Sequence, residues 1–360
     1  MIGVDCSSRV NRRQVTSLSI APHARAWLQH TTGARVLHVS DRACSLVSAA
    51  GEIVSLVLPE LREGPFAIVT PLDVSFSRFI DVDSCVAVHR AMVDVGDLRI
   101  DTSTAREWNP RPRWEDAHRA LLPDLTDTLL QWLRARAPSD SLAHALFKGL
   151  DFGKRPYLHS DSRLQPEIAS QKALAMTRAI EPAKASIPDI AKLQTGPGNR
   201  RAVVQSSVIE AARGPIASLQ AGIARGNLAL CCLGACGLAG LGAGLTPAGD
   251  DFLLGAMVAI WSTHSRSEAA ALAGSISEEA VWRTTSLSAA WLRSAARGEV
   301  AAPWHDLLDG MTAHSRERML AAAERILDMG HTSGADALAG LVVGLIAVDQ
   351  TTAVPLKFDL

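Results

Sequence analysis

Short apolar runs separated by turn residues fill the first third of the chain. Five such runs, rich in β-branched residues, lie at positions 36–39, 53–58, 66–69, 85–88 and 98–100. Glycine or proline stands between most of them, which is typical of strands joined by tight turns. The pattern predicts a small antiparallel β-barrel or sandwich.

The apolar spacing changes near residue 112. Residues 109–112, Asn-Pro-Arg-Pro, interrupt regular structure, and from Trp114 onward apolar residues recur every three or four positions. We therefore predict an α+β protein with a β-rich N-terminal domain over residues 1–112 and a mostly α-helical domain over residues 113–360. Within the second domain, residues 151–166 and 187–199 are expected to be long surface connections, with a lid as the alternative.

Two helix starts in the second domain share the pattern Gly-x-Asp-x-Leu-x-Gly. The first copy spans residues 249–255 and the second spans residues 334–340. In each copy the second glycine lies four residues after the aspartate, on the same helix face, where another backbone can approach closely. We predict that the two starts pack face to face about an approximate two-fold axis. Asp251 and Asp336 would then face one pocket.

Both helix starts also carry groups suited to bind an anion. Thr246 is predicted as the N-cap of the first helix and Pro247 as its first residue, after a loop that contains Gly242 and Gly244. A helix N-terminus reached through such a loop can hold a phosphate, although the P-loop and dinucleotide-binding patterns are absent. In the second start, His331 would serve as a general base or phosphate donor, or would cap a neighbouring helix.

Helix capping is the alternative interpretation of the acidic residues. A first-turn aspartate offsets the helix dipole, and Ser333 with Asp336 fits a capping box. Capping explains neither the repeated glycines nor the presence of Asp250 beside Asp251, so we favour a functional site. Carboxylates at a helix start repel a bound anion. A phosphate there would therefore need a cation such as Mg²⁺, held by Asp250, Asp251 and Asp336. The alternative is that the carboxylates face an amide or amine.

A third polar cluster lies at residues 283–288, Arg-Thr-Thr-Ser-Leu-Ser, on a helix predicted from about residue 277 to residue 296. Helical spacing places Thr285 and Ser288 on an apolar face, where they would line a pocket or bond back to the preceding turn. Arg283 is expected to be solvated, unless the helix begins near it and directs it at the site.

Composition narrows the choice of partners and compartment. The 36 basic and 37 acidic side chains nearly cancel, so no long-range field favours nucleic acid or an anionic membrane. Residues 228–249 carry no charge over a membrane-spanning length, but their glycines and Pro247 predict a buried helix that runs into a loop. The irregularly placed cysteines and the polar N-terminus predict a reduced, cytoplasmic protein that needs no metal or disulfide for stability.

Three segments together resemble the AllH-like family, a subunit type of oxamate carbamoyltransferase long catalogued as a domain of unknown function. They are Gly-Leu-Thr-Pro-Ala-Gly-Asp-Asp-Phe-Leu at 244–253, Arg-Thr-Thr-Ser-Leu-Ser at 283–288 and Gly-His-Thr-Ser-Gly-Ala-Asp at 330–336. Family members usually carry proline and serine where this chain has Ala243 and Ala248. The resemblance implies an enzyme with two other subunits, which interconverts oxamate and carbamoyl phosphate with oxalurate and phosphate in allantoin and purine nitrogen catabolism.

Carbamoyl transfer needs hydrogen-bond donors for a phosphate and for the oxyanion of a tetrahedral intermediate, which two helix N-termini could supply. On this interpretation His331, Asp251 and Asp336 are the candidate catalytic residues. The candidate substrate- or phosphate-binding residues are Gly242, Gly244, Thr246, Gly249, Asp250, Arg283, Thr284, Thr285, Thr332, Ser333 and Gly334.

Two alternatives stay open at this point. The chain could be a non-catalytic ligand-binding or assembly subunit of the same complex. It could also be a metal-dependent hydrolase built on Asp250, Asp251 and Asp336, which ranks last because the usual histidine ligands are missing.

Overall fold

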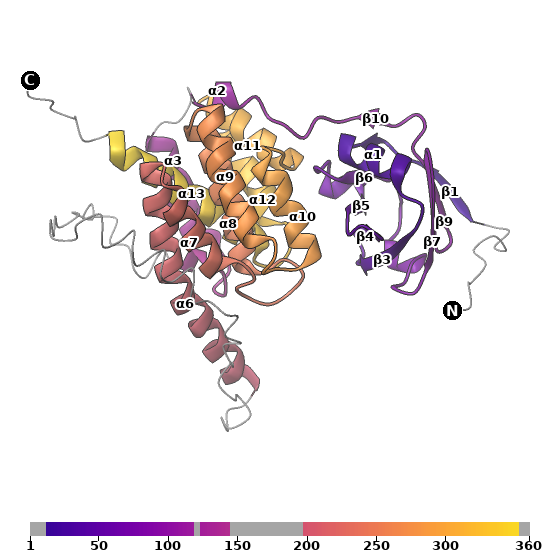
Figure 1. Ribbon diagram of the computed structural model, residues 1–360, viewed down its shortest axis with the longest axis horizontal. Helices are drawn as coiled ribbons and strands as arrows, with labels where there is room; N and C mark the ends of the chain where they lie inside the picture. The colour runs from indigo at the N-terminus through magenta and orange to yellow at the C-terminus, as the bar shows by residue number, and fades with distance from the viewer. Residues whose placement is uncertain (1–11, 119–122, 145–196, 353–360) are drawn as a thin grey trace, which may run out of the picture.

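The computed structural model describes residues 12–118, 123–144 and 197–352. Strands gather in the N-terminal part and helices in the C-terminal part, so the predicted α+β class is confirmed (Figure 1). Of the two predicted surface connections, residues 151–166 and 187–196 lie outside the described residues, and residues 197–199 begin a helix.

The described strands form a single mixed sheet. Their order across it is β1-β9-β8-β7-β3-β4-β5-β6-β2-β10. The strands are β1 Arg13–Thr16, β2 Ser19–Ile20, β3 Ala34–Val39, β4 Ala43–Ser48, β5 Ile53–Val57, β6 Ala67–Val69, β7 Cys85–His89, β8 Met92–Val95, β9 Leu98–Asp101 and β10 Arg106–Glu107. All five predicted runs are strands, whereas β1, β2, β4, β8 and β10 were not predicted.

The sheet differs from the predicted antiparallel arrangement in three pairings. β1 pairs with β9, β5 with β6 and β2 with β10 in parallel, and the other pairings are antiparallel. Two of these pairs join strands that are far apart in the sequence. Local alternation of apolar and polar residues indicates where strands lie but carries no information about such long-range partners.

One helix completes the core of the N-terminal part. Helix α1, Pro22–His30, begins with a proline at its first position, which needs no N–H partner there. It buries Ala24, Trp27 and Leu28 among the apolar side chains of the curled sheet, and the Trp27 indole N–H donates to the Glu52 carbonyl oxygen at 3.3 Å. Two short 3₁₀ turns, Pro59–Leu61 and Phe76–Arg78, join strands.

The C-terminal part is a bundle of helices. The described helices are α2 Trp114–His118, α3 Pro123–Arg136, α6 Pro197–Arg225, α7 Leu228–Leu238, α8 Ala248–Thr263, α9 Arg266–Ala280, α10 Ser286–Ala296, α11 Ala302–Thr312, α12 Arg316–Leu327 and α13 Ser333–Thr352. The uncharged run at 228–249 is divided between α7, a loop and the first turn of α8. None of the described helices has the length and apolar character needed to cross a membrane.

Helices α8 and α13 pack against each other at the centre of the bundle through the repeated glycines. A Cβ atom placed on Gly255 would lie 1.7 Å from the Ala337 carbonyl oxygen, and one on Gly340 would lie 1.9 Å from the Phe252 carbonyl oxygen. Both distances are far below van der Waals contact, so only glycine permits this approach. The predicted pairing of the two helix starts is therefore confirmed.

The first glycine of each repeat copy also has an equivalent role. A Cβ atom on Gly249 would lie 1.9 Å from the carbonyl oxygen of Leu238, at the end of α7. A Cβ atom on Gly334 would lie 1.9 Å from the carbonyl oxygen of Ile326, near the end of α12. Each helix start thus rests on the end of the helix that precedes it, as expected from an approximate two-fold relation.

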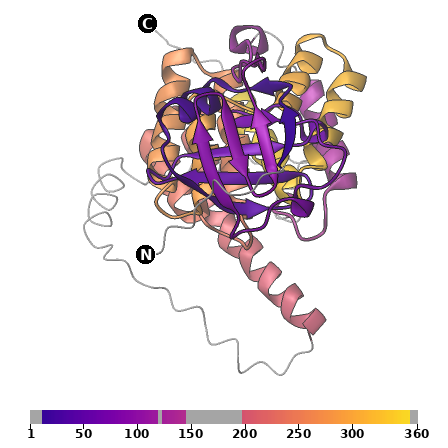
Figure 2. The same cartoon turned by 90° about the vertical axis from the view of Figure 1, so that its right-hand side faces the viewer.

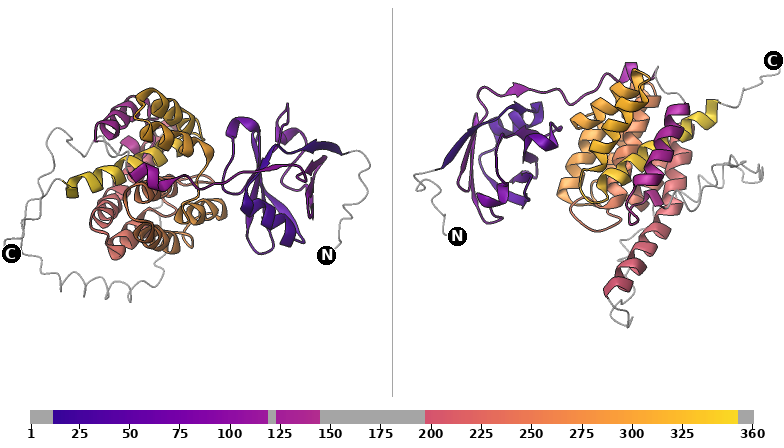
Figure 3. Two further views of the ribbon diagram at one scale, coloured as in Figure 1. Left: turned by 90° about the horizontal axis from the view of Figure 1, so that it is seen from above. Right: turned by 180° about the vertical axis from the view of Figure 1, so that it is seen from behind.

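The sheet covers one side of the helical bundle (Figure 2). An extended segment after β10 connects the two parts (Figure 3), and the Trp114 indole N–H, at the start of α2, donates to the Gly298 carbonyl oxygen at 3.1 Å. On the outer face of the sheet, Phe66 contacts Trp291 of α10 edge to face, with ring centroids 4.7 Å apart. The contact between Phe66 and Trp291 joins the two parts, and a cavity lies between them.

Replacement of Gly255 by alanine is expected to destabilise the fold. The added methyl group would collide with the Ala337 carbonyl oxygen, and overpacking of this kind typically costs about 1–3 kcal/mol or more. Thermal and urea unfolding followed by circular dichroism would measure the loss. Gly274→Ala in α9 is the matched control, because its Cβ would meet no atom within 4 Å; it should stabilise by up to about 1 kcal/mol. Equal stability of the two variants would contradict the close packing of α8 and α13.

Candidate functional site

Asp251 lies in the first turn of α8 and faces the start of α13. The hydroxyl groups of Thr246 and Ser333 hydrogen-bond to its carboxylate, and their two oxygens are 3.0 Å apart. Its other oxygen, Oδ2, is buried and has no hydrogen-bond partner among the described residues. Burial raises the pKa of Asp251 well above its ordinary value, and the negative charges of Asp336 and Asp250 raise it further, against the lowering by the two hydroxyls.

The two hydroxyls beside Asp251 do not have the capping roles predicted for them. Helix α8 begins at Ala248 with Pro247 as its N-cap, one residue later than predicted, so Thr246 caps nothing. Helix α13 begins at Ser333, and the Asp336 N–H donates to the Thr332 carbonyl oxygen, so the predicted capping box does not form. Both hydroxyls bond instead to the Asp251 carboxylate, which lies in the neighbouring helix start for Ser333 and in the same helix start for Thr246.

Asp250 fastens two loops to the start of α8. Its Oδ1 accepts a hydrogen bond from the Gly240 N–H at 2.9 Å, and its Oδ2 accepts one from the Thr284 hydroxyl. The carboxylate is 2% exposed. Burial raises its pKa, and the hydrogen bonds from Thr284 and Gly240 partly offset that rise. The second carboxylate of the Asp-Asp pair therefore has a structural explanation.

The predicted single helix from residue 277 to residue 296 is wrong. Helix α9 ends at Ala280 and α10 begins at Ser286. Thr285 is the N-cap of α10: its hydroxyl accepts from the Ser288 N–H at 3.1 Å and donates to the Leu245 carbonyl oxygen at 2.5 Å. Arg283 lies in the break and pairs with Glu279 at 2.9 Å, so its guanidinium is engaged at the surface. Side-chain capping by Thr285 thus outweighs the helical periodicity of the segment.

Asp336 is fully buried in the first turn of α13. Its Oδ1 accepts a hydrogen bond of 2.5 Å from the Leu142 N–H, and the Thr332 hydroxyl also bonds to the carboxylate. Its Oδ2 has no hydrogen-bond partner among the described residues. Burial is the largest cause that raises the pKa of Asp336 to about 7. The carboxylate holds the chain segment after α3 against the start of α13.

His331, Gly242 and Gly244 lie at the surface. The His331 Nε2 atom is 3.1 Å from Oδ2 of Asp140, and the ring is largely exposed. The φ angles of Gly242 and Gly244 are +115° and +105°, a region that side chains rarely adopt, so the loop before α8 depends on glycine.

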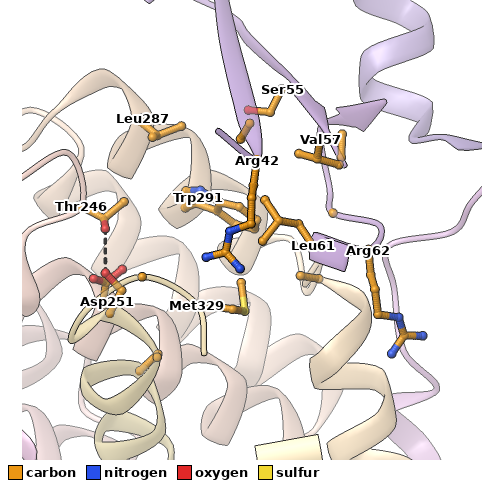
Figure 4. A pocket seen from close by; sticks show the side chains of 18 of the residues that line it. Arg42, Ser55, Val57, Leu61, Arg62, Thr246, Asp251, Leu287, Trp291 and Met329 are labelled. Carbon is orange, nitrogen blue, oxygen red and sulfur yellow. Dashed lines mark hydrogen bonds between the residues drawn. The ribbon is translucent and has the colours of Figure 1, made fainter. Parts of the chain in front are cut away.

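A cavity of about 350 Å³ lies between the sheet and the helical bundle, beside Asp251 (Figure 4). Of the predicted site residues, Thr246, Asp251, Ser333 and Gly334 line it. The structure therefore brings together the two helix starts at this cavity. The other predicted site residues, Asp336, His331, Thr332, Asp250, Gly249, Gly242, Gly244, Arg283, Thr284 and Thr285, are not among its described lining residues.

Two arginines of the N-terminal part line the same cavity and were not predicted. Arg62 pairs with Asp306 of α11. Arg42 lies in the turn before β4, and Figure 4 shows its side chain reaching between Trp291 and Leu61 into the cavity. In the described part of the chain its guanidinium has no hydrogen-bond or ion-pair partner. Its local sequence, Ser-Asp-Arg in a turn, gives no signal of such a role.

Residues 238–345 match the family model of the oxamate carbamoyltransferase subunit AllH. This confirms the resemblance predicted from the three motifs. The AllH match includes both paired helix starts and the α10 start, and it does not extend to the sheet that carries Arg42. The family name describes a subunit of a transferase complex. No solved structure matches the chain.

Asp250, Asp251 and Asp336 are the carboxylates from which the sequence predicts a cation site. Within residues 12–118, 123–144 and 197–352 there is no group of three or more His, Cys, Asp or Glu side chains that could hold a metal ion. Asp250, Asp251 and Asp336 each face different partners, as described above. The geometry therefore offers no support for a metal-dependent hydrolase built on these three residues.

The buried carboxylate of Asp336 predicts a pH dependence of stability. Because its folded pKa of about 7 lies above the ordinary 3.8, the folded state binds more protons than the unfolded state, and stability falls as pH rises toward the folded pKa. The loss between pH 5 and pH 8 should be about 2–3 kcal/mol. Urea unfolding at these pH values would measure it. Asp336→Asn should remove this part of the slope, and Asp309→Asn, an exposed carboxylate of α11, should leave it unchanged.

Proposed function

We propose that this chain is a subunit of an oxamate carbamoyltransferase and that the cavity beside Asp251 binds the acceptor amide. The proposal rests on the buried Oδ2 atom of Asp251, which has no hydrogen-bond partner among the described residues. Asp251 lines the cavity and lies within the segment that matches the AllH family model. An unsatisfied buried carboxylate oxygen is costly unless a ligand bonds to it. An acceptor N–H is a suitable partner.

The reaction proposed is the interconversion of oxamate and carbamoyl phosphate with oxalurate and phosphate. In the forward direction the amide nitrogen of oxamate bonds to the carbamoyl carbon, the bond from that carbon to the phosphate oxygen breaks, and phosphate leaves with its electron pair. The nitrogen loses one proton. No oxidant or reductant is required, so the protein has to position the reactants and accept this proton.

Asp251 is proposed as the group that accepts the proton. A general base works best when its pKa lies near the pH at which the enzyme operates, and burial raises the pKa of Asp251 in that direction. Thr246 and Ser333 bond to the same carboxylate and would hold it in one orientation while Oδ2 faces the nitrogen. In this proposal they are positioning residues.

The glycine-rich loop is proposed to contact the phosphate side of carbamoyl phosphate. Gly242 and Gly244 are exposed and lie in the loop directly before the start of α8, where an anion is favoured. His331 and Thr332 would act in the same way at the start of α13. These assignments keep the roles expected from the sequence and add no metal ion.

The remaining features of the proposal follow from the family resemblance. The chain would work with two other subunits in the cytoplasm, in allantoin and purine nitrogen catabolism. The second candidate function is a non-catalytic ligand-binding subunit of the same complex. This candidate is favoured because Asp251 lines the cavity, whereas His331 and the glycine-rich loop lie at the surface of the chain. The chemistry would then be completed by a partner.

The Asp251→Asn variant tests the catalytic assignment. The affinity-tagged chain is co-purified with its partner subunits from its native cells, and oxamate formed from oxalurate and phosphate is measured. We expect turnover by the variant complex to fall by about 10²–10⁴-fold, because the proton acceptor is lost. Its melting temperature near neutral pH should be unchanged or higher, since a buried carboxylate with a raised pKa is removed.

Asp309→Asn is the control for the same change in charge at an exposed site, and it should keep wild-type turnover. Loss of the complex or a large loss of stability in Asp251→Asn would show a structural role instead. Absence of oxamate formation in every preparation that contains the wild-type chain and its partners would contradict the proposed reaction.

A further inference from the structure

The cavity between the sheet and the helical bundle is lined by one exposed guanidinium and one buried carboxylate oxygen that bond to no other described residue. Four charged side chains line it: Arg42, Arg62, Glu63 and Asp251. Arg62 is paired with Asp306, and Glu63 accepts from Arg106 at 2.8 Å. Within the described part of the chain, the Arg42 guanidinium and the Asp251 Oδ2 atom are left without partners.

These two groups come from different parts of the chain and lie on different walls of the cavity. Figure 4 shows the Arg42 side chain extending from the sheet, with its guanidinium near Met329. Asp251 lies on α8, in the helical bundle. Apolar side chains, among them Leu287 and Trp291 of α10, line much of the remaining wall. Low polarity around a charged group strengthens its interaction with a ligand of opposite charge.

We propose that Arg42 binds the carboxylate of a small ligand whose N–H group is bound by Asp251 at the opposite side of the cavity. The ligand class is therefore a monocarboxylate with an amide nitrogen. The inference rests on the proposed function, from which the probe is chosen. The probe is oxamate, which carries one carboxylate and one amide nitrogen. It assigns a substrate-binding residue to the N-terminal part of the chain, outside the AllH-matched segment.

A carboxylate fits the charges better than a phosphate dianion does. One unpaired guanidinium balances one negative charge, and its fork of N–H groups matches the two oxygens of a carboxylate. A dianion would carry an unbalanced charge beside Glu63 and Asp251 in the same cavity. A cavity of about 350 Å³ is also within the range used for small-molecule binding.

The test compares three related probes by isothermal titration of the full-length chain. Oxamate carries the carboxylate and the amide, oxamide carries amides without a charge, and oxalate carries carboxylates without an N–H group. Arg42→Gln should raise the dissociation constant of oxamate by about tenfold or more and change that of oxamide less than about twofold. Asp251→Asn should weaken oxamate and oxamide and leave oxalate no weaker.

Arg90→Gln is the matched control, because Arg90 is an exposed arginine of the same sheet, in the β7–β8 turn, and does not line the cavity. It removes the same charge and should leave oxamate binding unchanged. Equal weakening by Arg42→Gln and Arg90→Gln would overturn the proposal, as would equal weakening of oxamate and oxamide by Arg42→Gln. Absence of oxamate binding to the wild-type chain would also overturn it.

Titration with inorganic phosphate tests whether Arg42 binds the carboxylate of oxamate or a phosphate group. If Arg42→Gln weakens phosphate binding and leaves oxamate binding intact, Arg42 contacts the phosphate side and the proposal is wrong. Failure of the proposed function gives a different result: oxamate binds in an Arg42-dependent way while the complex with its partners forms no oxamate from oxalurate. Oxamate formation that is the same in wild type and Arg42→Gln, at all oxalurate concentrations, would overturn the inference and leave the proposed function standing.

Discussion

The close packing of α8 against α13 is the constraint on which the rest of the helical part depends. Each helix presents a glycine to a carbonyl oxygen of the other, at Gly255 with Ala337 and at Gly340 with Phe252. Helices that are apolar on nearly all sides can exist only at the centre of a bundle, and here they can approach this closely because no side chain separates their backbones. The two N-termini are thereby brought side by side.

This pairing buries carboxylate oxygens at the two helix starts. Asp250 is satisfied by two loops, whereas Asp251 and Asp336 each keep one buried oxygen without a described partner. Asp336 holds the segment after α3 against the helix pair, and Asp251 borders the cavity. The repeat is thus symmetric in its backbone packing and asymmetric in the surroundings of its two aspartates. The aspartate of one copy bonds to the segment after α3, and the aspartate of the other copy borders the cavity.

The N-terminal sheet forms the second wall of the cavity, opposite the helices. It contributes Arg42, Arg62 and Glu63 to the cavity, and its contacts with α10, including Phe66 on Trp291, hold that wall in place. Specific recognition of a ligand with two different ends requires groups on opposite walls, and a single helix pair offers only one wall. A site between two parts of a chain meets that requirement.

Local patterns in the sequence determined the α+β class, five of the strands and the paired helix starts, because turn residues, periodicity and glycine spacing act over a few neighbouring residues. The repeat even indicated which backbones would touch. Tertiary structure alone decided that Thr246 and Ser333 bond to Asp251 instead of capping helices, that the helix predicted at 277–296 breaks at Thr285, and that Arg42 reaches the cavity. Ser333 is distant from Asp251 in the sequence, Thr285 is distant from the Leu245 carbonyl oxygen to which it donates, and Arg42 is distant from the helices that line the cavity. No local pattern of residues encodes partners of that kind.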